Sequence, residues 1–274
     1  MKTSLCLDPK RIRAAAVAGR FYPDNAADLR RQVENLLANA EPIGDPGPKA
    51  VIAPHAGYAY SGAVAASVYK QFESQTDLIT RVVLIGPAHY ESFSGVATTR
   101  ASAFATPLGL VPVEPSSIDC LKEIPWVSVR DEAHLLEHSL EVQLPFLQVV
   151  LHQFAIVPLL TGEVDAEQLS LVLDTLWGGA ETRIVISSDL SHYLDSETAR
   201  RIDLATAQAI ESLDPTRIGE LQACGCVPIR GLLESARRHH LRSGTMNLQN
   251  SGDAAGPLTK VVGYGAFTFQ DQNN

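Results

Sequence analysis

The chain has 274 residues, of which 45% are hydrophobic and 19% are charged, and its formal net charge is −9. This composition is that of a globular protein able to bury a core, and the acidic balance argues against a nucleic-acid surface or a polybasic membrane patch. The apolar runs are too short to span a bilayer, and the N-terminus lacks the apolar core of a signal peptide. We therefore expect a cytoplasmic protein that binds neither nucleic acid nor membranes.

The predicted elements alternate between helices and strands along the chain. An amphipathic helix is indicated over residues 26–40, where leucine and valine recur at helical spacing. Continuous apolar runs are typical of strands buried on both faces of a parallel sheet. Such runs occupy residues 50–53, 81–85, 154–160 and 183–186, and helical patterns occupy residues 62–74, 134–153, 166–177 and 196–213.

Two further segments complete the expected architecture. Residues 94–115 contain short runs separated by turns, which indicate an antiparallel excursion, and residues 260–270 indicate a final strand. Alternating strands and helices predict an α/β fold with a mostly parallel central sheet between two helical layers. No linker interrupts the pattern, so we expect a single domain over residues 1–274.

Polar side chains follow several of the predicted strands. His55 and His89 come directly after the first two strands, and Asp189 and His192 follow the fourth. In open α/β sheets, ligands bind outside the carboxyl ends of the strands. The repetition therefore predicts that these four side chains line one cleft.

His55 and His89 are candidate metal ligands. Neutral imidazole binds iron, copper, zinc or nickel, and the third ligand sets the preference among these metals. The alternative is that each histidine is simply hydrogen-bonded at the end of its strand.

Asp189 and His192 are a candidate acid–base pair. They are three residues apart, so a turn can place them on one face, where the carboxylate would orient the imidazole. Histidine then serves as a general base near neutral pH. The alternative is helix capping, for which Ser187, Ser188 and Asp189 are all suited.

A second group of polar residues lies within the predicted helix over residues 134–153. His134, His138 and Glu141 fall at helical positions i, i+4 and i+7, which share one face. We expect His138 and Glu141 to lie next to the metal ligands and to orient them without binding the ion. A buried polar seam would produce the same pattern.

Cys224 is the cysteine with the most suggestive context. It precedes Gly225 and Pro228, which break the chain just before a predicted helix. A thiol near a helix N-terminus has a lowered pKa, so Cys224 would act as a soft metal ligand or a redox-active thiol. The alternative is a small buried apolar residue.

Eight motifs together resemble a known family. The resemblance runs from about Ala18 to Phe269, and the chain is similar to the Memo family, also called AmmeMemoRadiSam system protein B. In chain order the motifs are AGRFYPDNAADL, APHAGYAYSG, GPAHY, ATPLG, EHSLEVQLPFLQ, SSDLSHY, ACGCVPI and VGYGAF.

The resemblance implies a fold similar to the class III extradiol dioxygenases, which are non-haem iron enzymes. It implies that His55 and His89 are the imidazole ligands, that Cys224 stands where those enzymes have a carboxylate, and that His192 is the base with Asp189 beside it. Sulfur in place of oxygen argues against ring cleavage and favours copper(I).

The resemblance also implies a function and partners. We expect a metal-dependent redox enzyme that uses an iron or copper ion and acts on a small-molecule or peptide ligand. The alternative is a non-catalytic binding module that recognises such a ligand in a vestigial active-site cleft. The family's second name implies association with radical-SAM and AMMECR-type proteins.

Overall fold

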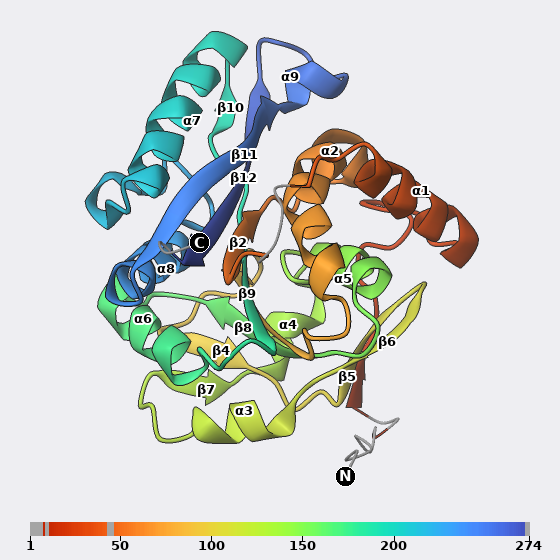
Figure 1. The fold of residues 1–274 in the computed structure, drawn as a ribbon, viewed down its shortest axis with the longest axis vertical. Helices are drawn as coiled ribbons and strands as arrows, with labels where there is room; N and C mark the ends of the chain where they lie inside the picture. Colours follow the sequence, from red (N-terminus) through yellow and green to blue (C-terminus); the bar gives the residue numbers. More distant parts are fainter. Residues whose placement is uncertain (1–7, 9–10, 43–46, 272–274) are drawn as a thin grey trace.

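The computed structural model describes residues 8, 11–42 and 47–271 (Figure 1). Within these residues nine strands form one large sheet, in the order β10-β12-β2-β9-β3-β8-β4-β7, with β11 alongside β12. The strands are β2 (Ala50–Ala53), β3 (Arg81–Pro87), β4 (Val96–Thr98), β7 (Val127–Val129), β8 (Ala155–Thr161), β9 (Thr182–Ser187), β10 (His192–Leu194), β11 (Leu241–Asn250) and β12 (Val261–Asp271).

The centre of this sheet is parallel, as predicted. β2, β9, β3 and β8 lie side by side in the same direction, and every residue of β2, β8 and β9 is buried. Antiparallel pairs extend the sheet on both sides, through β12 next to β2 and through β4 next to β8. The apolar runs of these central strands thus reflect burial on both faces.

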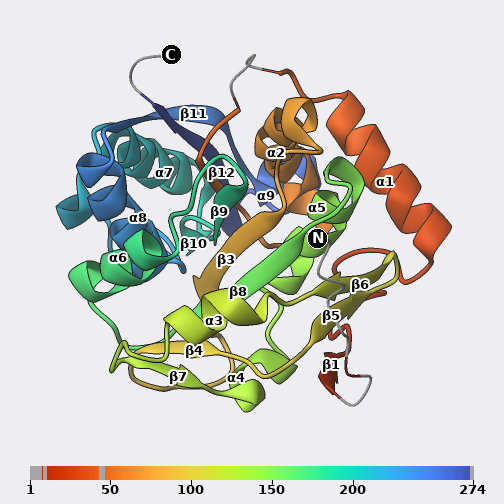
Figure 2. The ribbon, with the colours of Figure 1, turned by 60° about the horizontal axis from the view of Figure 1, so that its bottom comes forward.

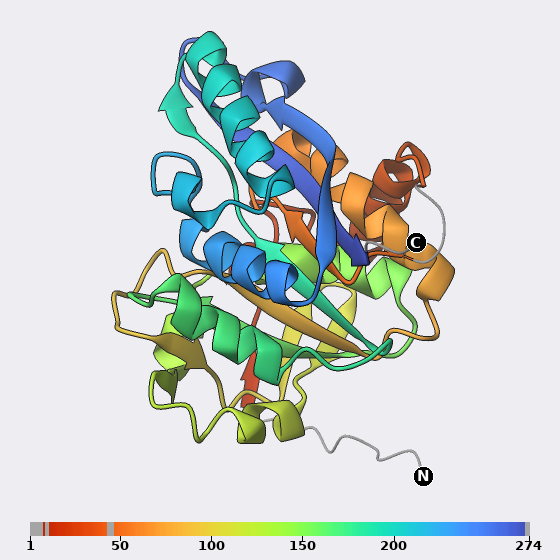
Figure 3. The ribbon, with the colours of Figure 1, turned by 60° about the vertical axis from the view of Figure 1, so that its left-hand side comes forward.

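Helices cover both faces of the sheet, which confirms the predicted α/β layers. Figure 2 shows the central strands between two groups of helices, and Figure 3 shows the second group from another side. The first group is α1 (Ala26–Ala38), α2 (Tyr58–Tyr69) and α5 (Leu144–Val150); the second is α6 (Ala166–Thr175), α7 (Ser196–Glu211) and α8 (Cys226–Arg238).

The predicted excursion over residues 94–115 forms strands of both sheets. β5 (Ala103–Thr106) and β6 (Gly109–Pro112) pair antiparallel and join β1 (Ile12–Arg13) in a small second sheet. Short helical segments fill the remaining connections: η2 (Lys70–Gln75), α3 (Pro115–Cys120), η4 (Pro215–Arg217) and α9 (Ser251–Ala254). Among the described residues, no helix combines the length and the apolar character that a membrane crossing requires.

The continuous helix predicted over residues 134–153 is wrong. The chain forms α4 (Asp131–Leu135), a loop, η3 (Glu141–Gln143) and then α5, which has a proline in its first turn. The side chains of Arg13 and Glu137 form hydrogen bonds with backbone groups that would otherwise pair within a helix. Arg13 donates to the carbonyls of His134 and Glu137, and the Glu137 carboxylate accepts the N–H groups of residues 138 and 139.

A buried ion pair ties this loop to the N-terminal segment. Arg13 and Glu141 are 6% and 0% exposed, and their side chains are in direct contact. The carboxylate of Glu141 also accepts the N–H groups of Ala16 at 2.7 Å and Val17 at 3.0 Å, and the hydroxyl of Tyr22. Because each acceptor position on Glu141 is used, residues 13–22 and the loop hold each other in place.

We expect Glu141→Ala to destabilise the protein by about 3–5 kcal/mol, because it leaves the Arg13 guanidinium buried without its partner. Urea unfolding measures the loss. Glu34→Ala is the control, since it breaks only an exposed pair with Arg30 at 3.9 Å and should cost at most about 1 kcal/mol. Similar losses in both variants would contradict a structural role for the Arg13–Glu141 pair.

Candidate metal centre

Three histidines meet at the carboxyl edge of the central strands. His55 lies two residues after β2 and His89 two residues after β3, while His138 lies in the loop between α4 and η3. One ring nitrogen from each histidine lies within 4.8 Å of the other two. Since β2 and β3 both flank β9 as parallel neighbours, their carboxyl ends bring His55 and His89 together.

The ring geometry suits convergence on one ion. The centroids of His55 and His89 are 5.2 Å apart, those of His55 and His138 are 5.5 Å apart, and those of His89 and His138 are 4.8 Å apart. Two nitrogen or sulfur donors on one tetrahedral ion lie about 3.3–3.8 Å apart, given metal–ligand bonds of about 2.0–2.3 Å. Small side-chain movements would therefore bring the three imidazoles onto a shared ion.

The hydrogen bonds of His55 determine which nitrogen is available. Ser187 donates its only hydroxyl hydrogen to the carbonyl of Ser139 at 2.6 Å and lies 2.9 Å from Nδ1 of His55. Nδ1 must therefore carry the hydrogen and donate it to Ser187, which leaves the lone pair on Nε2. Burial, followed by the charge of His89, lowers the pKa of His55 to about 3, so the ring stays neutral.

Glu137 determines the orientation of His89 in the same way. Its Oε1 lies 2.9 Å from Nδ1 of His89, and its Oε2 accepts the backbone N–H of His89 at 2.5 Å. Burial alone would raise the pKa of Glu137, but the hydrogen bonds and charge of His89, with the backbone N–H groups, lower it to about 2. The ionised carboxylate accepts from Nδ1, so Nε2 of His89 keeps its lone pair.

His138 carries an unsatisfied nitrogen. Its Nδ1 is buried and has no hydrogen-bond partner among the described residues, although Oε1 of Glu137 lies 3.3 Å away. Burial, followed by the charge of His55, lowers the pKa of His138 to about 4. A buried polar atom without a partner is costly, so the ring is suited to gaining one from a bound ion.

Cys224 lies against His55. Its Sγ is 3.3 Å from Nε2 of His55 and 3.7 Å from the carbonyl oxygen of Asp189. The expectation of a lowered thiol pKa is wrong, because burial, followed by the charge of Asp189, raises the pKa of Cys224 to about 12. The thiol would therefore lose its proton only in exchange for a bound cation.

Asp189 and His192 make different contacts from those of the expected pair. Asp189 is buried, and its Oδ1 accepts the backbone N–H groups of His55 at 2.8 Å and Ala56 at 3.3 Å. Burial raises the pKa of Asp189, against these hydrogen bonds. His192 begins β10 opposite Val262 and is half-buried, close enough for its charge to act on His55 and Asp189. Asp189 thus fixes the backbone that carries His55.

The remaining expected residue, Glu141, points its carboxylate to Arg13 and the N-terminal segment, four residues beyond Glu137. Glu137 had no predicted role, and Ser187 was predicted only as a helix cap. The signal for Glu137 was its position immediately before His138 within the motif EHSLEVQ. Both residues act by holding Nδ1 of a histidine.

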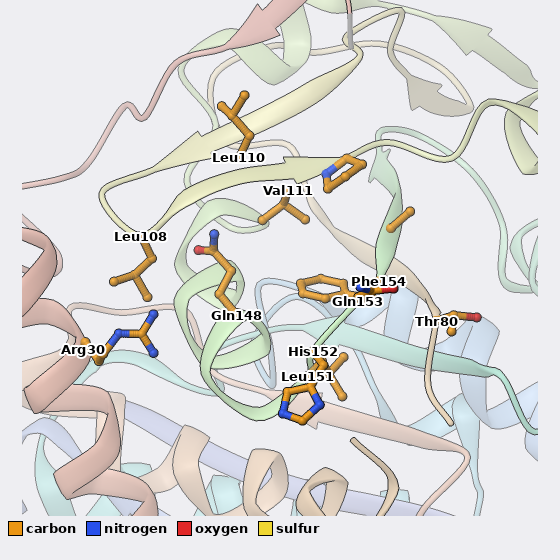
Figure 4. A pocket seen from close by; sticks show the side chains of 12 residues that line it. Arg30, Thr80, Leu108, Leu110, Val111, Gln148, Leu151, His152, Gln153 and Phe154 are labelled. Carbon is orange, nitrogen blue, oxygen red and sulfur yellow. The ribbon is translucent and has the colours of Figure 1, made fainter. Parts of the chain in front are cut away.

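A sizeable cavity lies elsewhere in the molecule. It measures about 510 Å3 and is enclosed by the β5–β6 hairpin, the end of α5 and Arg30 of α1 (Figure 4). Figure 4 shows Leu108, Val111 and Phe154 along its walls. None of the three clustered histidines lines it, so the candidate centre rests on donor geometry and not on cavity size.

These features define an α/β protein with a candidate metal centre at the carboxyl edge of its parallel strands. The family model of Memo-like proteins matches residues 13–268. The chain therefore belongs to the Memo-like family, which confirms the resemblance seen in its motifs.

Relatives match over almost their whole length. A MEMO1 family protein of Aquifex aeolicus is 36% identical over 270 residues, covering 94% of this chain and 99% of the relative. One from Methanopyrus kandleri is 33% identical over 282 residues, with the same coverage of 94% and 99%. The crystal structure of an uncharacterized protein from Escherichia coli K12 matches with a TM-score of 0.52 at 12% identity, covering 80% of this chain and 98% of that one. At this identity the likeness shows the fold alone.

We expect Glu137→Gln to weaken transition-metal binding by about 10–100-fold, because the neutral amide no longer fixes the hydrogen on Nδ1 of His89. Anaerobic titration calorimetry measures the change. Glu132→Gln is the matched control, since Glu132 lies five residues earlier and is exposed. Equal affinities in the two variants would contradict the role assigned to Glu137.

Proposed function

We propose that His55, His89 and His138 hold an iron or copper ion in a metal-dependent redox enzyme. The observation that carries this proposal is the convergence of three imidazoles, two of which have Nδ1 held by a hydrogen-bond partner so that Nε2 faces the shared position. The donors fit the group, since imidazole suits both metals and the unpartnered Nδ1 of His138 would gain a contact. When bound, such an ion supplies electron transfer with oxygen or an organic substrate.

Cys224 extends the donor set. Its Sγ lies at a distance from Nε2 of His55 that suits two ligands of one ion. The ligand set implied by the family resemblance, His55, His89 and Cys224, therefore shares two members with the histidine cluster. A thiolate in the set favours copper(I) over iron(II).

His192 is our candidate for proton transfer. It is half-buried and sits at the start of β10, outside the group of three converging histidines. Histidine moves protons near neutral pH without needing to bind the ion. Asp189 contributes by fixing the backbone of His55 and Ala56.

A second candidate function is a ligand-binding module without catalysis. Tyr90 directly follows His89 and is 55% exposed, and Tyr193 directly follows His192 and is 67% exposed. The Tyr193 backbone has φ 62°, a left-handed conformation that is costly for tyrosine. Exposed aromatic rings, of which Tyr90 lies against His138 of the cluster, are suited to recognising a small-molecule or peptide ligand. The family resemblance adds radical-SAM and AMMECR-type proteins as candidate partners.

Metal titration tests the ligand assignment. We expect His138→Ala to weaken iron(II) and copper(I) binding alike, by at least about tenfold, because imidazole serves both metals. Cys224→Ser should weaken copper(I) much more than iron(II), because softness is lost while an oxygen donor remains. Anaerobic titration of each variant with both metals gives the comparison.

His152→Ala is the matched control for these variants, because the His152 side chain is 67% exposed and bound to Asp77. If wild-type protein bound neither metal at one per chain, the redox proposal would fail and the binding module would replace it. Loss of metal in His138→Ala but not in Cys224→Ser would assign the ion to the three histidines.

The role of His192 separates proton transfer from metal binding. We expect His192→Ala to keep the metal stoichiometry of the wild type and to lower oxygen consumption by the metal-loaded protein, with ascorbate as reductant, by about 100-fold or more. Metal analysis and an oxygen electrode measure the two quantities. Loss of the metal in this variant would make His192 a ligand, and unchanged turnover would remove it from the reaction.

A further inference from the structure

A second cluster of charged residues lies at the opposite end of the same two strands. Lys49 directly precedes β2 and Arg183 is the second residue of β9, and both line a cavity of about 470 Å3. Six residues separate Lys49 from His55, which is about 20 Å at 3.3 Å per residue. The cavity is therefore remote from the histidines.

Arg183 has donors to spare in this cavity. It is 5% exposed, and its Nη1 donates to the carbonyls of Ala180 and Thr182 at 2.9 Å each. Its Nη2 donates to Oε1 of Gln75, and its buried Nε has no hydrogen-bond partner among the described residues. A guanidinium has five N–H donors, so three acceptors leave two donors, including Nε–H.

Lys49 contributes charge to the same cavity. Its Nζ donates to the carbonyls of Trp177 at 2.6 Å and of Gly179 and Thr182 at 3.0 Å. These contacts use its three hydrogens, so it acts on a ligand through its charge. Lys49 and Arg183 both donate to the carbonyl of Thr182, which places the two cations side by side. Burial, followed by the charge of Arg183, lowers the pKa of Lys49 to about 8.

Among the described residues, neither Lys49 nor Arg183 forms a direct ion pair, although Glu181 and Asp271 are close enough for their charges to act on both. Asp271 also lines the cavity, but among the described residues no carboxylate oxygen lies within 4 Å of the nitrogens of Lys49 or Arg183. The nearby Glu181 pairs with Arg81 at 3.1 Å, and His239 lies 3.2 Å from Asp174. Two cations and one carboxylate line the cavity, and Glu181, whose charge also acts on both cations, is paired with Arg81.

We propose that this cavity binds a small oxyanion, a phosphate or carboxylate group of a metabolite, through Arg183 with Lys49 as the supporting charge. Buried cations are costly unless they are paired, and an arriving oxyanion supplies the missing negative charge. It would accept the two remaining hydrogens of Arg183 in a charge-assisted contact. Nothing in this assignment depends on the histidine cluster.

Trp177 provides a built-in reporter. It lines the cavity, stacks on His239 with centroids 3.8 Å apart, and has Lys49 Nζ 5.5 Å from its ring. The chain has two tryptophans, so Trp126→Phe leaves Trp177 as the single fluorescent indole. An anion that binds beside Lys49 changes the electric field on this ring.

The test is a fluorescence titration of Trp126→Phe protein with inorganic phosphate and, separately, with acetate, at ionic strength held constant with sodium chloride. We expect a saturable change with at least one anion. Arg183→Gln, made in the same background, should weaken binding by at least about tenfold, the size of one charge-assisted hydrogen bond. Lys49→Gln should also weaken binding, because the supporting positive charge is lost. The better anion identifies the ligand group as a phosphate or a carboxylate.

Two controls separate this site from other effects. Arg30→Gln removes a cation that lines a different cavity, and His55→Ala alters the candidate metal centre, so both should bind the anion as the parent does. No saturable change in the parent with either anion would overturn the proposal, as would unchanged affinity in Lys49→Gln. The Lys49 variant decides the outcome if Arg183→Gln does not fold.

Discussion

The buried carboxylate of Glu137 is the contact on which the histidine cluster depends. It binds the backbone and Nδ1 of His89 and the backbone N–H groups of His138 and Ser139, so it joins the end of β3 to the loop after α4. Burial disfavours its charge, yet four donors hold its pKa at about 2. The charged form is thus kept where it can fix two imidazoles relative to each other.

A second carboxylate, four residues along, holds the same loop from the other side. Glu141 forms an ion pair with Arg13 and accepts the backbone N–H groups of Ala16 and Val17, more than a hundred residues away in the chain. Arg13 in turn occupies carbonyls that would otherwise continue α4. The position of His138 therefore depends on the long-range contacts of Arg13 with this loop and not on the helical pattern of the neighbouring residues.

This difference explains how much of the site could be predicted from the sequence. The strands of the parallel core were found because their burial leaves a continuous apolar run, and His55 and His89 follow directly from the strand ends. His138 could not be placed, since periodicity at residues 134 to 141 indicates a helix and carries no trace of Arg13. The position of Pro145 argues against a continuous helix over residues 134–153, because proline fits the first turn of α5 and not the middle of a longer helix. β11 was missed because its half-exposed, largely polar residues lack the pattern of a buried strand.

Burial has opposite consequences at the two ends of β2 and β9. At the carboxyl end it lowers the pKa of His55 and His138, and the neutral imidazole that results is the form that binds a metal ion. At the amino end, Arg183 cannot release its proton, so burial leaves a charge that only a counterion can compensate. The same desolvation therefore favours neutral imidazoles at one edge of the sheet and leaves a buried guanidinium charge at the other.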